Sequence, residues 1–151
     1  MVEIVGGNKA GTALAKIERN LSTTGGVPTV KVGFLAGATY PDGTSVPLVA
    51  AINEFGAPSR GQPPRPFMRN TIAAHAEEWP RDLAKILKAN GGDGEAALAL
   101  MGDRIKGQIR RSINDLMEPA LADSTVARKG FEKPLVDTSH MWNSVDFVVE
   151  E

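Results

Sequence analysis

The residues whose types and neighbours come closest to a reactive or metal-binding site are the two histidines. The stretch HAEE (75–78) contains the His-x-Glu arrangement that opens a zinc-deaminase motif. That chemistry also requires a later pair of cysteines, and the chain has no cysteine. His75 and Glu78 alone supply neither a third ligand nor the spacing of a metal site. We therefore interpret His75 as a polar-face residue of a helix.

The second histidine, His140, follows Asp137 and Ser139, which are residue types that hydrolases use. The groups of a catalytic triad normally converge from separate elements, whereas these three are close neighbours in sequence. A hydrolase that uses His140 is therefore the least favoured function. The glycines and lysine of GGNKAG also lack the spacing of a phosphate-binding loop. The sequence predicts no catalytic residue, no cofactor and no metal, and we do not expect an enzyme.

A third segment, DRIKGQIRR (103–111), carries a concentration of positive charge. On a helix its basic side chains would flank an apolar stripe, where they could contact the phosphates of DNA. The alternative is an ordinary amphipathic helix whose arginines cover apolar surface and meet acids elsewhere, and we favour it. No aromatic residue alternates with the basic ones, so stacking on bases has no support. The candidates for facing DNA or a lumen are Arg104, Lys106, Arg110 and Arg111.

Length and composition restrict the wider choice of function. The chain has 151 residues, a length typical of one domain, and we treat 1–151 as a single domain. Its net charge of −1 predicts no general attraction to DNA or to anionic lipid. The N-terminus lacks the features of a signal peptide, and no apolar run approaches the roughly 20 residues of a membrane span. We expect a soluble, cytoplasmic chain without a membrane partner.

Two strands and an N-terminal helix would frame the domain. A helix is weakly assigned within 1–25, where Leu14, Ile17 and Leu21 recur at helical spacing. Apolar and polar residues alternate in 28–35, which is typical of a half-buried strand. A terminal strand is predicted at 145–150. We expect both strands in one small, mostly antiparallel sheet.

Two long helices should pack against that sheet. Apolar residues step by three and four through 66–89 and again through 95–117, and Pro80 should kink or divide the first helix. Gly102 and Gly107 are unfavourable inside the second helix, so we expect close approach to another backbone there. The stretch 119–133 has no period and is predicted to be an exposed loop. The predicted fold class is α+β.

A short helix, PLVAAINEFG (47–56), is predicted between the first strand and the long helices. One of its faces carries Leu48, Ile52 and Phe55. Glu54 lies in the last turn, where an acid opposes the helix macrodipole. We expect a cation from the following loop to hold this carboxylate, and the candidates are Arg60 and Arg65.

Two segments at irregular joints resemble a family of tailed-bacteriophage neck or tail-completion proteins. The first is Glu54-Phe55-Gly56, followed by Pro64-Arg65-Pro66-Phe67-Met68-Arg69 at the start of a long helix. The second is Lys133-Pro134-Leu135-Val136-Asp137-Thr138, which Ser144-Val145 closes. Ser139 and Met141 stand where the family usually has glycine and leucine. If that glycine serves a positive φ, Ser139 must adopt another turn or bear the strain.

The resemblance implies a structural protein of the virion. Copies would form a ring, with a hexamer as the expected number, in the neck or at the top of the tail. The ring would join the head connector or adaptor protein to the tail terminator or tail tube protein. DNA would pass through its lumen without sequence-specific binding. The expected location is the virion, after assembly in the host cytoplasm, and a DNA-binding adaptor that uses 104–111 stays the alternative.

The resemblance also assigns a role to the proline-rich stretch. Prolines restrict the backbone before the long helix, so the approach to it is stiff. Phe67 and Met68 would pack into the strand layer, while Arg65 and Arg69 would point toward Glu54 or toward a neighbouring subunit. A ring subunit needs such stiffness because its contact surfaces must keep fixed angles. The expected interface or structural residues are Glu54, Phe55, Gly56, Arg65, Pro66, Phe67, Arg69, Asp137 and Thr138.

Overall fold

The computed structural model of the protein describes residues 28–120, 127, 130, 135 and 139–150. The predicted N-terminal helix in 1–25 and nearly all of the predicted loop 119–133 lie outside the described residues. So do Asp137 and Thr138, two of the residues expected at an interface.

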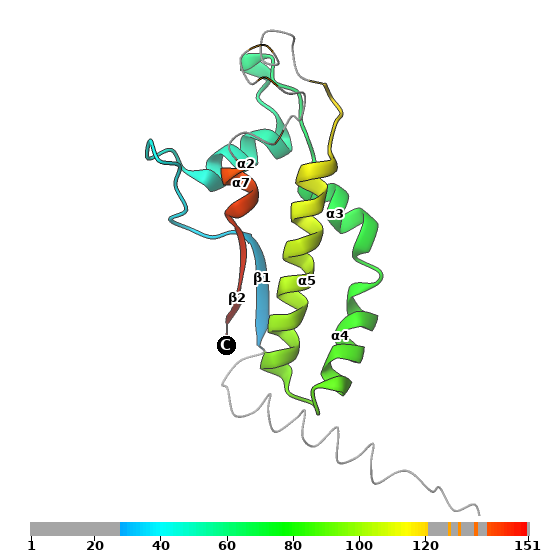
Figure 1. The fold of residues 1–151 in the computed structure, drawn as a ribbon. Coiled ribbons are helices and arrows are strands. Elements are labelled where there is room, and N and C mark those ends of the chain that lie inside the picture. Colours follow the sequence, from blue (N-terminus) through cyan, green and yellow to red (C-terminus); the bar gives the residue numbers. More distant parts are fainter. Residues whose placement is uncertain (1–27, 121–126, 128–129, 131–134, 136–138, 151) are drawn as a thin grey trace, which may run out of the picture.

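A two-stranded antiparallel sheet forms one layer of the described fold (Figure 1). Strand β1 (Thr29–Phe34) pairs with β2 (Val145–Glu150), and Val32 lies opposite Phe147. Directly opposite residues share a face, so the alternating apolar side chains of both strands collect on one side. Both predicted strands and the α+β class are confirmed.

Helix α5 (Gly94–Asp115) lies along the sheet and forms the centre of the fold (Figure 1). The carboxylate of Asp93 begins this helix by accepting a hydrogen bond from the N–H of Ala96 at 3.0 Å. The helix ends at Asp115, close to the end of the predicted helix 95–117.

The two glycines inside α5 have different surroundings. A Cβ at Gly102 would lie 2.6 Å from the ring of Phe147 and 2.9 Å from a methyl group of Val30. Gly102 is therefore closely packed, but its nearest neighbours are side chains of the sheet and not the backbone that was predicted. Outside the backbone of α5 itself, no atom of the described residues lies within 4 Å of a Cβ built at Gly107, so the structure shows no close approach there.

The predicted helix 66–89 is two helices, α3 (Phe67–His75) and α4 (Trp79–Ala89). Pro80 stands in the first turn of α4, where its missing N–H leaves no helical hydrogen bond unmade. Of the two expected forms, a kink or two abutting helices, the second is correct. Both helices lie against α5 (Figure 1).

Helix α2 (Val46–Phe55) follows the loop after β1, and Ser45 forms its N-cap. The Ser45 hydroxyl accepts a hydrogen bond from the N–H of Leu48 at 3.4 Å. The buried side of α2 carries Val46, Ala50 and Glu54. The three large apolar residues that the sequence grouped together lie on the opposite side.

The core lies where α2, α3 and α5 meet the upper end of the sheet (Figure 1). Phe67 is fully buried in it, and its ring meets the ring of Phe34 edge to face at a centroid distance of 6.0 Å. The methyl group of Met68 lies 3.6 Å from the position of a Cβ built on Gly33. Phe67 and Met68 therefore both reach the strand layer, as predicted. The largest fully buried side chains are Phe67, Ile109, Ile113, Val46 and Val145.

Candidate functional site

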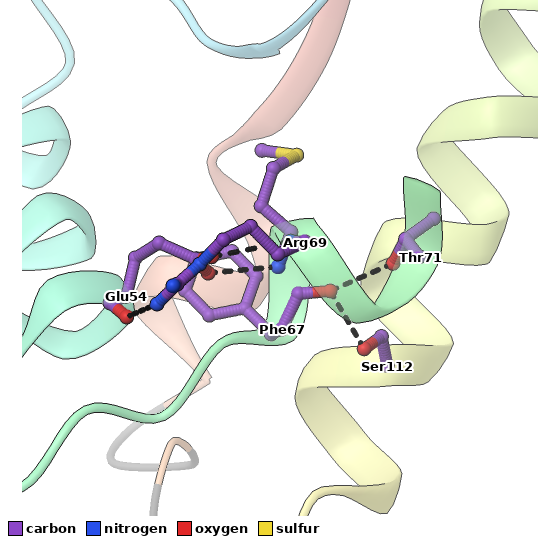
Figure 2. Close-up of polar contacts among 6 residues, drawn as sticks. Glu54, Phe67, Arg69, Thr71 and Ser112 are labelled. Carbon is purple, nitrogen blue, oxygen red and sulfur yellow. Dashed lines mark hydrogen bonds and ion pairs between the residues drawn. The ribbon is translucent and has the colours of Figure 1, made fainter. Parts of the chain in front are cut away.

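Most of the residues singled out by the first motif meet at the joint between α2 and α3. Glu54 is at the centre of this joint and is only 5% exposed. Its carboxylate accepts hydrogen bonds from the backbone N–H groups of Met68, at 2.8 Å, and Arg69, at 3.1 Å (Figure 2). These groups belong to the first turn of α3, whose N-cap residue, Pro66, has no side-chain acceptor. Glu54 therefore caps α3 from another helix, where the macrodipole favours a negative charge.

Arg69 completes the joint from the other direction. Its Nε lies 2.8 Å from Oε1 of Glu54, and its Nη2 donates to the carbonyl oxygen of Glu54 at 2.7 Å (Figure 2). That carbonyl belongs to the last turn of α2, where carbonyls lack helical partners and a cation is favourable. Each helix thus supplies the charged group that the end of the other helix needs.

The predicted ion pair of Glu54 exists, but not with the first candidates. Arg60 lies exposed in the short 3-10 helix η1 (Pro58–Arg60), and Arg65 turns away toward the end of α5. Arg69 is the partner because the carboxylate already lies at the first turn of α3, where Arg69 stands. An acid is favourable in the last turn of α2 because its carboxylate contacts the first turn of α3.

Gly56 lets the chain turn back sharply after α2. Its φ of 78° and ψ of 177° place it in a region that is open essentially to glycine alone. A Cβ there would lie 2.8 Å from the carbonyl oxygen of Gln62 and 2.8 Å from the nitrogen of Pro64. The N–H of Arg65 donates to the carbonyl of Asn53 at 2.7 Å, which ties the returning chain to α2. The proline-rich stretch is therefore packed directly on the helix that precedes it.

Arg65 anchors the joint to the chain beyond α5. Its side chain is 5% exposed, and it donates to the carbonyls of Pro119 at 3.2 Å and Ala120 at 3.3 Å. Burial lowers the pKa of the Arg65 guanidinium from its usual value. Among the described residues its hydrogen-bond partners are these carbonyls.

Two hydroxyl groups, one from α3 and one from α5, donate to the same carbonyl at the start of α3. The carbonyl of Phe67 accepts from the hydroxyl of Thr71 and from the hydroxyl of Ser112, each at 2.8 Å (Figure 2). Ser112 belongs to α5, so this bond joins the first turn of α3 to the central helix. The start of α3 is thus held by Glu54 from α2 and by Ser112 from α5.

The joint places an apolar helix face on the surface. Leu48 is 57% exposed and Phe55 is 67% exposed, while Ile52 between them is partly buried. The guanidinium carbon of Arg69 lies 5.2 Å from the centroid of the Phe55 ring, so this exposed ring has a fixed neighbour. We call the face formed by Leu48, Ile52 and Phe55 the α2 apolar face. Its orientation was not apparent from the sequence, although Val46 and Ala50 gave α2 a second apolar side.

Three of the four basic residues predicted to face DNA or a lumen have partners within the chain. Arg104 on α5 pairs with Asp82 of α4 at 2.7 Å. Lys106 pairs with Asp146 of β2 at 3.2 Å and lies over the ring of Phe147. The hydrogen bond from the N–H of Phe147, followed by that from Lys106, lowers the pKa of Asp146 from its usual value.

Arg110, like Arg104 and Lys106, has partners within the chain, whereas Arg111 has no such partner among the described residues. Arg110 lies over the ring of Trp142 at 4.6 Å and donates to the carbonyls of Asn143 and Val145. Arg111 is exposed, and it makes no hydrogen bond or ion pair with the part of the chain that the structure describes. The favoured interpretation of this segment, basic side chains covering apolar surface and meeting acids, describes Arg104, Lys106 and Arg110.

Each of the two histidines contacts nearby residues of the fold. Nδ1 of His75 lies 3.5 Å from Oε2 of Glu78, one turn further along the chain. Nε2 of His140 lies 2.8 Å from the carbonyl oxygen of Thr39, and the His140 ring stacks on Tyr40. Over the described residues, no group of three or more acidic or histidine side chains could hold a metal ion.

Ser139 bears the backbone strain that its position implies. Its φ of 56° and ψ of 11° lie in the left-handed region, where a glycine is favoured. It precedes the short helix α7 (His140–Asn143), and Met141 of that helix is buried in the core. The glycine usual in the resembled family would fit this conformation without strain.

Comparison with known proteins gives no relative for this chain. It matches no protein-family model, and neither a curated protein nor a solved structure is significantly similar to it. Within the described residues, none of the helices combines the length and the apolar composition that a membrane span requires.

Proposed function

We propose that this protein is a structural subunit of a tailed-bacteriophage virion. Its copies form a ring, a hexamer by the resemblance, in the neck or at the top of the tail. The two sequence motifs support this assignment, since both occur in the order and positions typical of neck and tail-completion proteins. Five residues of the first motif also make one compact joint: Glu54, Gly56, Arg65, Phe67 and Arg69.

The observation that carries the proposal is the α2 apolar face. Single exposed apolar residues are common on proteins, but this face presents Leu48 and Phe55 from one short helix with Ile52 between them. The reciprocal capping by Glu54 and Arg69 fixes α2 relative to α3 and α5. A ring closes only if each subunit holds its contact surfaces at one angle, so a rigid apolar face suits a ring subunit.

The proposed partners follow from the place of the ring. One side contacts the head connector or adaptor protein, and the other contacts the tail terminator or tail tube protein. DNA passes through the lumen without sequence-specific binding. The protein is assembled in the host cytoplasm and ends in the virion.

A DNA-binding adaptor is the alternative function, and it would use the basic residues of α5. Arg104, Lys106 and Arg110 already have partners within the chain, whereas the Arg111 side chain makes no hydrogen bond or ion pair with the described residues. Titration with labelled duplex DNA at increasing salt distinguishes the two functions. Tight binding that weakens steeply with salt would favour the adaptor, because release of counterions is the mark of many phosphate contacts.

Deletion of the gene from the phage that carries it tests the proposal. We expect electron microscopy of the lysate to show DNA-filled heads and separate, complete tails. Supplying the protein from a plasmid should restore joined virions, and antibody labelling should place it between head and tail. Joined, infectious virions in the absence of the protein would contradict the proposal.

A further inference from the structure

We infer that the α2 apolar face is covered by residues 8–21 of the neighbouring subunit. The inference rests on the proposed ring and names the contact that links one copy to the next. Residues 8–21 lie outside the described residues, and the sequence predicts them to be an amphipathic helix.

The apolar spacings of the two segments are complementary. The α2 apolar face has apolar residues at positions i, i+4 and i+7, and it is 57% and 67% exposed at its two ends. Leu14, Ile17 and Leu21 stand at positions i, i+3 and i+7 of the N-terminal segment. Over two turns of a helix, each set lies on one face, so the helix predicted for 8–21 matches the length of the α2 apolar face. Packing of an amphipathic helix on such a face is a common mode of recognition.

The charges at the edge of the face also match. The Arg69 guanidinium lies over the Phe55 ring and pairs with Glu54 through Nε, but its side chain is 55% exposed, so part of this cation lies beside the apolar surface. Glu18 flanks the apolar stripe of the N-terminal segment on the helical wheel. An acid in that position can approach Arg69 when the two apolar stripes are in contact.

The position at which the chain enters β1 favours a neighbour's segment over the chain's own. β1 begins at the end of the sheet that is remote from α2 (Figure 1). β1 has six residues and is therefore about 20 Å long. Residues 22–28 can span at most about 25 Å when fully extended. The chain's own segment would use nearly all of that length to return along the sheet, before it crosses to α2.

Disulfide trapping in virions tests the inference, because the chain has no cysteine of its own. A chain carrying both Ile17→Cys and Ile52→Cys is supplied to phage that lack the gene. Joined virions are then purified, oxidised and denatured without reductant. We expect a ladder of disulfide-linked multimers up to the number of subunits in the ring. Each single-cysteine variant should give monomer alone.

A matched pair controls for chance collisions between cysteines. Lys16→Cys with Ile52→Cys places the first cysteine on the opposite side of the predicted helix, and we expect at least tenfold less multimer than with the test pair. Equal yields from the two pairs would overturn the inference. A monomer with an internal disulfide would also overturn it, since the segment would then cover its own α2.

The same preparation separates this inference from the proposed function. If the joined virions contain the protein but the test pair gives no ladder, the ring proposal stands and the contact between copies is different. If joined virions contain none of the protein, the proposed function fails, and the inference that rests on it fails as well.

Discussion

Glu54 is the residue on which the α2–α3 joint depends. An acid at the C-terminus of α2 opposes the macrodipole of that helix, but the same carboxylate lies at the N-terminus of α3, where a negative charge is favourable. Arg69 pairs with this carboxylate and places a positive charge at the C-terminus of α2. The pair therefore supplies the side-chain cap that α3 lacks and adds a cation at the end of α2, where Gly56 is the C-cap. Glu54 and Arg69, which stand in the two halves of the first motif, are therefore direct partners.

Replacement of Glu54 tests this role. Glu54→Gln keeps the shape of the side chain but removes the charge that faces Arg69 and the first turn of α3. We expect it to lower the free energy of unfolding by about 1–2 kcal/mol, the usual value for a cap or a charged hydrogen bond. Urea unfolding measures the change. Glu77→Gln, at an exposed position, is the control, and equal small effects from both variants would contradict the capping role.

Ser139 offers a prediction in the opposite direction. A left-handed conformation disfavours a side chain by about 1–2 kcal/mol, although glycine also gives up more backbone entropy on folding. We expect Ser139→Gly to stabilise the protein by about 0.5–1 kcal/mol net. Thermal unfolding should show a higher midpoint for this variant. Ser144→Gly is the matched control because Ser144 has a φ of −82°, and it should not stabilise the protein.

At the scale of elements, α5 holds the two layers together. It contacts the sheet through Gly102 and contacts α4 through Arg104, which pairs with Asp82. Gly102 and Gly107, the two glycines in the interior of α5, are a natural comparison, since they differ in their surroundings and share one helix.

Alanine at each glycine should therefore have effects of opposite sign. Gly107→Ala meets no neighbour within 4 Å and should stabilise the protein by about 1 kcal/mol through helix propensity. Gly102→Ala places its Cβ against Phe147 and Val30, and overpacking of this kind costs about 1–3 kcal/mol. Denaturant unfolding of the two variants checks the difference. A stabilising Gly102→Ala would show that the sheet can move away from α5 at little cost.

Two basic residues of α5, Arg110 and Arg111, should likewise differ in how much they contribute to stability. Arg110→Ala loses the contact with Trp142 and two hydrogen bonds to carbonyls, so we expect a loss of about 1–2 kcal/mol. Arg111→Ala should change stability by less than about 0.5 kcal/mol. Thermal unfolding distinguishes the two variants. Equal, negligible effects would mean that the contacts of Arg110 contribute nothing to the fold.

Periodicity in the sequence predicted most of the described elements, because α5 and the strands each bury one regular stripe. Periodicity alone made 66–89 one helix, whereas the local effect of Pro80 on the backbone predicted a kink or two abutting helices, and α3 and α4 are two helices. The orientation of α2 was harder to predict. One apolar side of α2 carries Val46 and Ala50, and a second, larger one carries Leu48, Ile52 and Phe55. The larger side is the one that size alone would bury, but it is the exposed side.

Long-range contacts determine which side of α2 is buried and which cation pairs with Glu54, because periodicity does not determine either. The buried side of α2 includes Glu54, and an acid becomes acceptable there only when α3 brings its N-terminus and Arg69. The α2 sequence alone contains no sign of that contact. For the same reason, the sequence predicted that Glu54 needs a cation but gave Arg60 and Arg65 as the first candidates.

At the scale of the whole molecule, the rigid joint and the α2 apolar face have different tasks. The joint and the core around Phe67 maintain the fold, whereas the task we propose for the face is assembly. Phe67→Ala should therefore cost about 3–5 kcal/mol, as expected for a fully buried aromatic residue. A loss below about 1 kcal/mol, measured by denaturant unfolding, would mean that Phe67 is not a core residue.

The most direct test of the central claim, that the α2 apolar face serves assembly, is the fraction of joined virions formed with Leu48→Glu. Leu48 is the third residue of α2, and Ser45 is its N-cap, so glutamate there would form a capping box that supports the helix. Ala84→Glu, at an exposed site of α4, adds the same charge away from the face. We predict unchanged thermal midpoints for both variants, together with separate heads and tails for Leu48→Glu alone. Normal joining by a stably folded Leu48→Glu variant would contradict the account.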